Sequence, residues 1–151
     1  MKDILFNQLN AVPSGLLEVD SMQLGSLLPK PTLIHLPGKL TEPLFISVLL
    51  HGNEPTGFLA VQQLLKKYLH RELPRSLALF FGNIDAAAQN ARRLEHQPDY
   101  NRIWPGTELP ASPETEMAAA VITTMRERRV FASIDVHNNT GLLNCLENLV
   151  R

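Results

Sequence analysis

The feature that most constrains the fold is a regular alternation of short apolar runs with longer amphipathic stretches. Residues 44–50, 76–83 and 130–137 (LFISVLL, SLALFFGN and VFASIDVH) are apolar and rich in β-formers, as expected of interior strands. Between them, residues 58–73 and 112–129 have the spacing of amphipathic helices. Strand, helix, strand, helix, strand is the order found in an α/β sheet, so the pattern predicts an α/β domain.

The rest of the chain predicts shorter elements and loops. Residues 32–36 (TLIHL) form a further strand, and the prolines and glycine of residues 37–43 (PGKLTEP) predict a turn-rich loop that leads to the next strand. Residues 84–94 predict a short helix or helical turn, whereas the prolines of residues 96–113 predict an irregular loop. Residues 1–30 have no sustained period and are expected to be a lead-in that packs on the domain.

Both predicted helices carry specific signals. In the first helix Leu59, Leu64 or Leu65, and Leu69 recur at helical spacing, which predicts the buried face. The second helix is expected to begin at Ser112, an N-cap residue followed by proline and an acidic first turn.

Size, charge and cysteine content restrict the class of protein. A chain of 151 residues with 44% hydrophobic residues predicts one domain, residues 1–151. Its 14 Lys and Arg nearly balance its 15 Asp and Glu, so we expect a small-molecule partner and no nucleic acid or membrane. Cys145 is the only cysteine, and no apolar run is long enough for a signal peptide or a membrane span, so we expect a cytoplasmic protein.

Two potential metal ligands follow directly after the apolar run at residues 44–50. His51 and Glu54 stand three residues apart, and Gly52 allows a sharp turn between them. Zn²⁺ accepts imidazole nitrogen and carboxylate oxygen as ligands. Because H-x-x-E arises often by chance, an alternative stays open, in which Glu54 caps a helix beside an ordinary buried histidine.

A third ligand candidate strengthens the zinc hypothesis. His137 ends the strand at residues 130–137, and parallel strands would bring this end close to His51 and Glu54. Three protein ligands and a water make a catalytic zinc site. Asp135 lies on the same face of the strand and is expected to hydrogen-bond the ring of His137, the alternative being a carboxylate that caps a neighbouring helix.

Four ordered motifs resemble the zinc carboxypeptidase superfamily, and within it the branch of succinylglutamate desuccinylases and aspartoacylases. The motifs are His51-Gly52-Asn53-Glu54, Gly82-Asn83 with Arg92 nine residues after Asn83, Asn101-Arg102 with Pro105-Gly106, and Asp135-Val136-His137. The resemblance implies a mixed, largely parallel sheet flanked by helices. It also implies one Zn²⁺ per chain, bound by His51, Glu54 and His137.

The resemblance further implies roles for four polar residues. Arg92 would polarise the scissile carbonyl and stabilise the oxyanion, while Asn101 and Arg102 would hold a substrate carboxylate. Asn83 would lie in the substrate site, where it orients a loop or Arg92, the alternative being an ordinary asparagine that ends the strand. Arginine suits such roles because its charge is permanent and its fork binds carboxylates in pairs of hydrogen bonds. The alternative for Arg92 is a solvated surface charge, and Arg93 beside it makes the alignment less certain.

The resemblance implies a zinc-dependent hydrolase that cleaves the amide bond of a small N-acyl amino acid. The general base of the family lies well downstream of the third ligand, but this chain ends 14 residues after His137 and Glu147 does not match that base in position. We therefore expect the C-terminal portion of the family domain to be absent. Two alternatives stay open, a carboxypeptidase-type metallopeptidase and a catalytically silent zinc-binding domain. The sequence predicts no oligomeric state.

Overall fold

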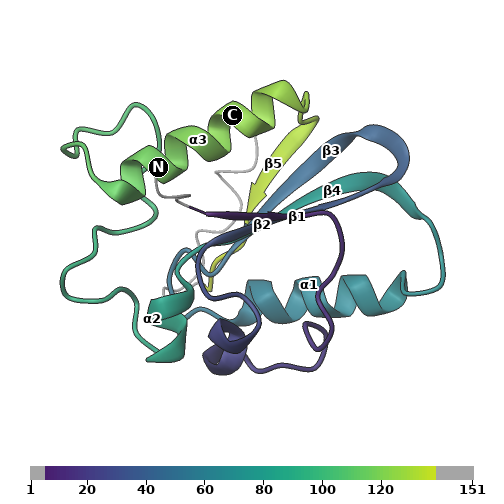
Figure 1. Cartoon of the computed structure of the whole chain (residues 1–151), viewed down its shortest axis with the longest axis horizontal. Coiled ribbons are helices and arrows are strands. Elements are labelled where there is room, and N and C mark those ends of the chain that lie inside the picture. Colours follow the sequence, from purple (N-terminus) through teal and green to yellow (C-terminus); the bar gives the residue numbers. More distant parts are fainter. Residues whose placement is uncertain (1–5, 139–151) are drawn as a thin grey trace.

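A central sheet of five strands organises the chain, as the computed structural model of residues 6–138 shows (Figure 1). The strands are β1 (Asn7–Leu9), β2 (Thr32–Leu36), β3 (Gly38–Val48), β4 (Leu73–Phe81) and β5 (Ala132–Asp135). Their order in the sheet is β1-β2-β4-β3-β5. The β2–β4 pair is antiparallel and the other three pairs are parallel, which confirms the mixed, largely parallel α/β sheet.

Helices cover both faces of this sheet (Figure 1). One face packs on α1 (Thr56–Lys67), together with the 3₁₀ helix η1 (Ser21–Ser26) and the short helix α2 (Ile84–Ala88). The other face packs on α3 (Pro113–Glu127). Because side chains of a strand alternate between its two faces, each interior strand contributes to both cores. In β4, for example, Leu79 and Phe81 face α1, whereas Ala78 and Phe80 face α3.

The prediction of a loop at residues 37–43 is wrong, because β3 already begins at Gly38. The strand accommodates this turn-rich sequence through an irregularity: between Leu40 and Leu44, three residues of β3 lie opposite only one residue of β4. A bulge leaves residues without ladder hydrogen bonds, and Pro43 within it has no N–H to offer. The strand therefore continues through the proline instead of ending there.

The first predicted helix is shorter than expected and turned about its axis. It ends at Lys67 rather than at residue 73, and β4 then begins at Leu73. Its buried apolar face consists of Phe58, Val61 and Leu65, whereas Leu59 and Leu69 are 50% and 61% exposed. The leucines at 59 and 69 therefore do not define the packed face, which is set by the contacts of Phe58 with the sheet core.

The predicted start of the second helix is confirmed. The Ser112 hydroxyl accepts a hydrogen bond from the Thr115 backbone N–H at 3.3 Å, and the Thr115 hydroxyl accepts one from the Ser112 N–H at 2.8 Å. This reciprocal pair is a capping box. The short helix expected after residue 83 is also present as α2.

The third predicted strand is shorter and more exposed than expected. β5 covers only Ala132–Asp135, and all four of its residues are exposed. Within residues 6–138, β5 pairs with β3 alone, so it forms an edge of the sheet that the structure describes. The prediction of a buried strand is wrong for this reason, although the sequence pattern of an interior strand is present.

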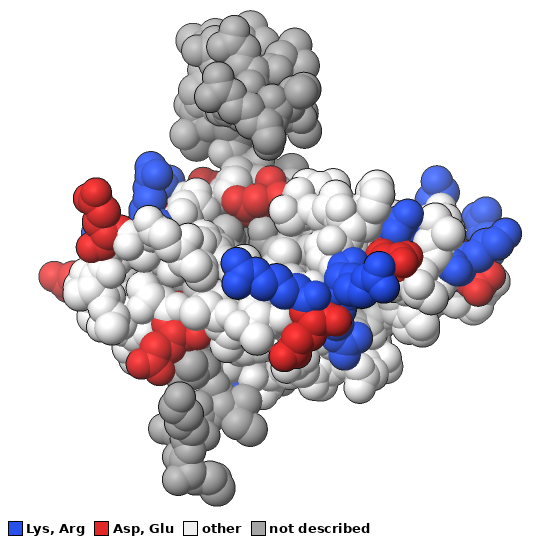
Figure 2. Space-filling view, turned by 90° about the horizontal axis from the view of Figure 1, so that it is seen from above, with Lys and Arg blue, Asp and Glu red and all other residues white. Residues whose placement is uncertain are grey.

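The surface carries charges of both signs. On the face shown in Figure 2, most residues are uncharged, and Lys and Arg lie near Asp and Glu. Within residues 6–138, no helix has the length and apolar character that a membrane span requires.

The buried His35 of β2 predicts a specific pH dependence of stability. Its ring is 6% exposed and its Nε2 lies 2.9 Å from Oε1 of Gln8, while burial and the charge of Arg128 lower its pKa to about 4. In the unfolded chain the ring takes up a proton near pH 6.5. Its contribution to the free energy of unfolding is therefore complete above pH 6.5 and is lost as the pH falls toward 4.

We predict that wild-type protein loses on the order of 3 kcal/mol more unfolding free energy between pH 7 and 4 than His35→Gln does. Urea denaturation at both pH values measures this difference. Parallel pH profiles of wild type and variant would contradict the assignment.

Candidate metal centre

The ends of two adjacent parallel strands bring the candidate ligands together. β3 ends at Val48, and the loop that follows carries His51 and Glu54 before α1 begins. β5 ends at Asp135, two residues before His137. Since β3 and β5 run parallel and side by side, both ends lie at the same edge of the sheet, as predicted (Figure 1).

Gly52 allows the ligand loop to pack closely on α2. A Cβ atom at this position would lie 2.2 Å from the backbone of both Ala86 and Ala87, a distance that no side chain tolerates. The Gly52 N–H donates to the carbonyl of Arg92 at 3.2 Å. The glycine between His51 and Glu54 is therefore required by packing, and it ties the ligand loop to the chain after α2.

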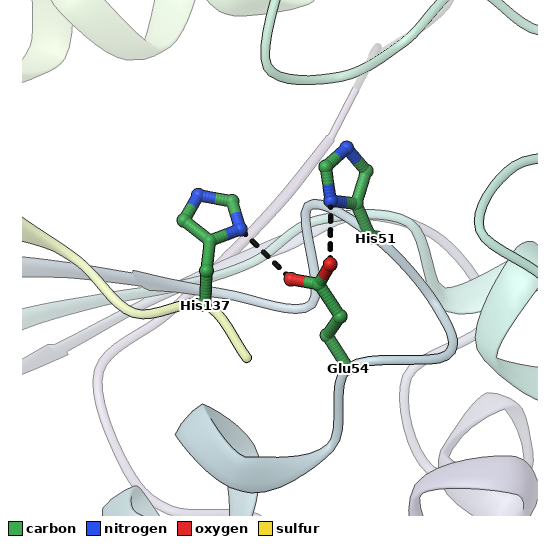
Figure 3. Close-up of side chains that lie close together, drawn as sticks. All are labelled: His51, Glu54 and His137. Carbon is green, nitrogen blue, oxygen red and sulfur yellow. Dashed lines mark hydrogen bonds and ion pairs between the residues drawn. The ribbon is translucent and has the colours of Figure 1, made fainter. Parts of the chain in front are cut away.

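Glu54 stands between the two histidines (Figure 3). Its Oε1 lies 3.1 Å from Nδ1 of His51, and its Oε2 lies 2.9 Å from Nδ1 of His137. The potential ligand atoms of all three residues lie within 4.8 Å of one another. His51 and Glu54 are buried, and His137 is partly buried. Within residues 6–138, this is the one such group of three or more His, Cys, Asp or Glu side chains.

The Nε2 atom of each imidazole contacts a second carboxylate, on the side of the ring away from Glu54. Nε2 of His51 lies 2.8 Å from Oδ1 of Asp99, and Nε2 of His137 is in close contact with Oδ2 of Asp135. The Ser47 hydroxyl donates to the other oxygen of Asp135 at 2.8 Å. A histidine that donates Nε2–H to a carboxylate leaves Nδ1 as its metal-binding atom. In both histidines, Nδ1 is the nitrogen that faces Glu54, as this arrangement requires.

The two alternatives to a metal site do not match these contacts. Glu54 does not cap α1, whose N-terminal residue Thr56 instead donates its N–H to Oδ1 of Asn138 at 3.3 Å. Asp135 contacts His137 and Ser47 rather than a helix. Two imidazole nitrogens and one carboxylate are a donor set that Zn²⁺ accepts at catalytic sites, so these residues fit the ion.

Electrostatic shifts follow from the same contacts. The hydrogen bond to Asp135 raises the pKa of His137 to about 9; Glu54 acts in the same direction, and burial acts against them. Burial raises the pKa of Asp99, but hydrogen bonds from His51, the Asn101 backbone and Arg92 outweigh it and hold this pKa at about 2. Asp99 is therefore ionised at neutral pH, as a carboxylate that accepts from a histidine must be.

Arg92 lies beside this group. Its Nη2 is 3.1 Å from Oδ2 of Asp99, and its Nη1 is 3.8 Å from Oε1 of Glu54. The side chain is still 55% exposed. The structure thus places Arg92 beside the candidate ligands, whereas the neighbouring Arg93 donates to the carbonyl of Gln97 at 2.7 Å.

The other predicted substrate residues lie in the loop after α2 and at the end of β4. Asn101 has a buried Oδ1 without a partner among the described residues, whereas Arg102 is exposed. Asn83 is only 1% exposed; its Oδ1 caps α2 at the Ala86 N–H (3.1 Å), and its Nδ2 donates to Gln97 Oε1 (2.8 Å). The side chain of Asn83 is thus engaged within the protein, and the substrate roles of all three residues stay predictions.

Sequence analysis missed Asp99 and Gln97. Both stand in an irregular loop, where no periodicity indicates which side chains point inward. The available signal was a carboxylate two residues before Asn101-Arg102, a pair already assigned to the site. The other described histidines, His35, His70 and His96, are not part of the metal group.

Fold and site together define an α/β domain with a histidine–glutamate–histidine centre at the carboxyl edge of its sheet. Residues 41–148 match the succinylglutamate desuccinylase/aspartoacylase catalytic domain, and the chain therefore belongs to this family. The family is one of hydrolytic deacylases, which supports the prediction that the chain is an enzyme. No curated protein and no solved structure matches the chain.

The contact between Asp99 and His51 predicts the effect of a single substitution. Asp99→Asn keeps the shape but removes the negative charge that holds the Nε2–H of His51. Loss of such a carboxylate lowers metal affinity by about 10- to 100-fold. We predict a loss in this range for zinc, measured by competition with a chromogenic chelator.

Asp85→Asn is the matched control, because Asp85 is an exposed carboxylate in the first turn of α2 and is not part of the metal group. Equal zinc affinities for Asp99→Asn and Asp85→Asn would show that Asp99 does not support the site.

Proposed function

We propose that this chain is a zinc-dependent hydrolase that cleaves the amide bond of a small N-acyl amino acid. The observation that supports it most is the convergence of two Nδ1 atoms on one carboxylate, with each ring held by a second carboxylate. Family membership supports hydrolytic deacylation as the reaction class.

In this proposal, His51, Glu54 and His137 hold the ion. Bound zinc supplies a water of lowered pKa, near 7, and a positive charge that polarises a carbonyl group. Asp99 and Asp135 keep both imidazoles in the tautomer whose Nδ1 binds metal. Because His51 and Glu54 are buried, the ligands themselves exclude bulk water from one side of the centre.

Arg92 is the proposed electrophilic residue. Asp99 and Glu54 fix its guanidinium beside the ligands, and its exposed part leaves N–H donors for a substrate. A fixed cation next to the scissile carbonyl stabilises the negative charge that develops on the carbonyl oxygen. The neighbouring carboxylates thus position Arg92.

Asn101 and Arg102 are proposed to select substrates that carry a free carboxylate. The unpartnered buried Oδ1 of Asn101 offers an acceptor that a substrate N–H can satisfy, and a buried polar atom without a partner is rare in folded proteins. Arg102 is the next residue and is exposed, and its positive charge suits a substrate carboxylate.

One observation favours a second candidate, a zinc-binding domain without hydrolytic activity. Hydrolysis needs a general base that takes the proton of the attacking water. Within residues 6–138, the carboxylates at the centre are Glu54, Asp99 and Asp135, and each already contacts a histidine. Glu147, the later carboxylate considered from the sequence, lies outside the described residues.

Metal content tests the centre itself. We predict one zinc per chain in purified protein, and a loss of zinc affinity of at least 100-fold in His51→Ala and His137→Ala, because each removes a direct ligand. Elemental analysis and chelator competition measure both. His70→Ala, which removes an exposed histidine after α1, should retain wild-type affinity. Zinc-free wild-type protein, or equal affinity of all variants, would remove the basis of the proposal.

A substrate panel tests the reaction. We predict zinc-dependent hydrolysis of N-acyl amino acids at a higher kcat/KM than that of short peptides or of N-acyl amino acid amides, which lack the free carboxylate. Arg102→Ala should raise KM by about tenfold or more with kcat nearly unchanged, whereas Arg92→Ala should lower kcat.

Arg126→Ala, at the end of α3, serves as the control for a lost surface charge. Preference for peptides would support the carboxypeptidase-type alternative. Stoichiometric zinc without turnover at high enzyme concentration would support the silent zinc-binding domain instead.

A further inference from the structure

Gln97 is a buried polar residue in the middle of the loop between α2 and α3. Its exposed fraction is only 6%, although the loop around it is largely open to solvent. Its Oε1 accepts from Asn83 Nδ2 at 2.8 Å and from the Leu94 backbone N–H at 3.0 Å. Its own carbonyl accepts from Arg93 at 2.7 Å. Gln97 thus connects the loop to itself and to the end of β4.

The partner of Gln97 is itself firmly held. Asn83 follows β4 directly, its backbone N–H donates to the Leu49 carbonyl at 2.7 Å, and its Oδ1 caps α2. Leu49 is two residues before His51 in the ligand loop. The hydrogen bond from Asn83 therefore attaches Gln97 to the rigid edge of the sheet from which the metal ligands emerge.

Two residues after Gln97, Asp99 contacts the proposed ligand His51. Pro98 restricts the backbone, and Asp99 then contacts Nε2 of His51 at 2.8 Å and Arg92 at 3.1 Å. The start of the same stretch is tied to the ligand loop through the Gly52 N–H and the Arg92 carbonyl. Gln97 lies between Arg92 and Asp99 in sequence and attaches this stretch to Asn83.

We infer that Gln97 is a positioning residue of the metal centre, which holds Asp99 against His51 by anchoring residues 93–98 to Asn83. Among the described residues, no hydrogen bond joins Gln97 to His51, Glu54 or His137, so Gln97 acts through Asp99. The inference rests on the proposed function, since it assigns Gln97 a role in presenting Nδ1 of His51 to zinc.

If Gln97 only stabilised the fold, its loss would lower stability without a specific effect on zinc binding. Gln62 provides the matched control for such a loss of stability. Gln62 of α1 is equally buried at 5%, and its Nε2 donates to the carbonyls of Leu16 and Val19, both at 2.8 Å. These bonds attach the lead-in segment to α1, on the face of the sheet opposite α3. Gln62→Leu and Gln97→Leu therefore each remove two side-chain hydrogen bonds, one buried and one partly buried, but only Gln97→Leu does so next to Asp99.

The experiment measures three quantities: zinc affinity by chelator competition, thermal unfolding, and the hydrogen bond between His51 Nε2–H and Asp99 by ¹H–¹⁵N NMR of the histidine rings in metal-free protein. We expect Gln97→Leu to lower zinc affinity about tenfold, the lower end of the effect of residues that support metal ligands. We also expect the His51 Nε2–H proton to exchange faster with water, because its hydrogen bond to Asp99 is weakened. Gln62→Leu should lower Tm but leave zinc affinity and this hydrogen bond as in wild type.

Gln97→Glu provides a second variant, because its carboxylate can still accept from Asn83 and from the Leu94 N–H. It should keep the hydrogen bond between His51 and Asp99 and bind zinc more tightly than Gln97→Leu. Unchanged zinc affinity and an unchanged hydrogen bond in Gln97→Leu, or equal losses in Gln62→Leu, would overturn the inference while leaving the zinc site intact. Zinc-free wild-type protein would instead refute the proposed function, and the hydrogen bond between His51 and Asp99 would still decide whether Gln97 positions Asp99.

Discussion

The parallel pairing of β3 with β5 is the constraint on which the candidate site depends. This pairing places Ser47 opposite Asp135 and brings the strand ends of both segments to one edge of the sheet. His51 and Glu54 follow one strand and His137 follows the other, so 83 residues of sequence separate Glu54 from a ring that lies 2.9 Å away. Without the register of these two strands, the ligands would be unrelated positions along the chain.

Around this pairing, the structure fixes the ligands from several directions. Asp135 holds His137 and is itself held by Ser47 on the neighbouring strand. Asp99 holds His51 from a loop that would otherwise have few constraints. A metal ligand whose second ring nitrogen is hydrogen-bonded needs little reorganisation when an ion binds, because its tautomer and direction are already set. The short β5, exposed on all four residues, thus carries Asp135, the side chain that connects Ser47 with His137.

Much of the fold was predictable because the local signals agree with the tertiary packing. The Ser112 cap, the strand after the first helix and the strand before His137 all depend on nearby residues, and each is present. The errors arise where packing overrides a local signal. Pro43 looks like a loop residue but lies in a bulge within β3, and Leu59 looks like a core residue but is exposed because Phe58 directs the helix toward the sheet.

The sequence by itself determined the α/β class and the family, and it predicted His51, Glu54 and His137 as metal ligands, because each follows or ends an apolar run and belongs to a short ordered motif. Only the tertiary structure decided which residues support these candidate ligands. Asp99, Arg92 and Gln97 lie in or beside a loop without periodicity, and their direction results from contacts with Asn83, Gly52 and His51. Such contacts join segments that are distant in sequence, so no local pattern can encode them.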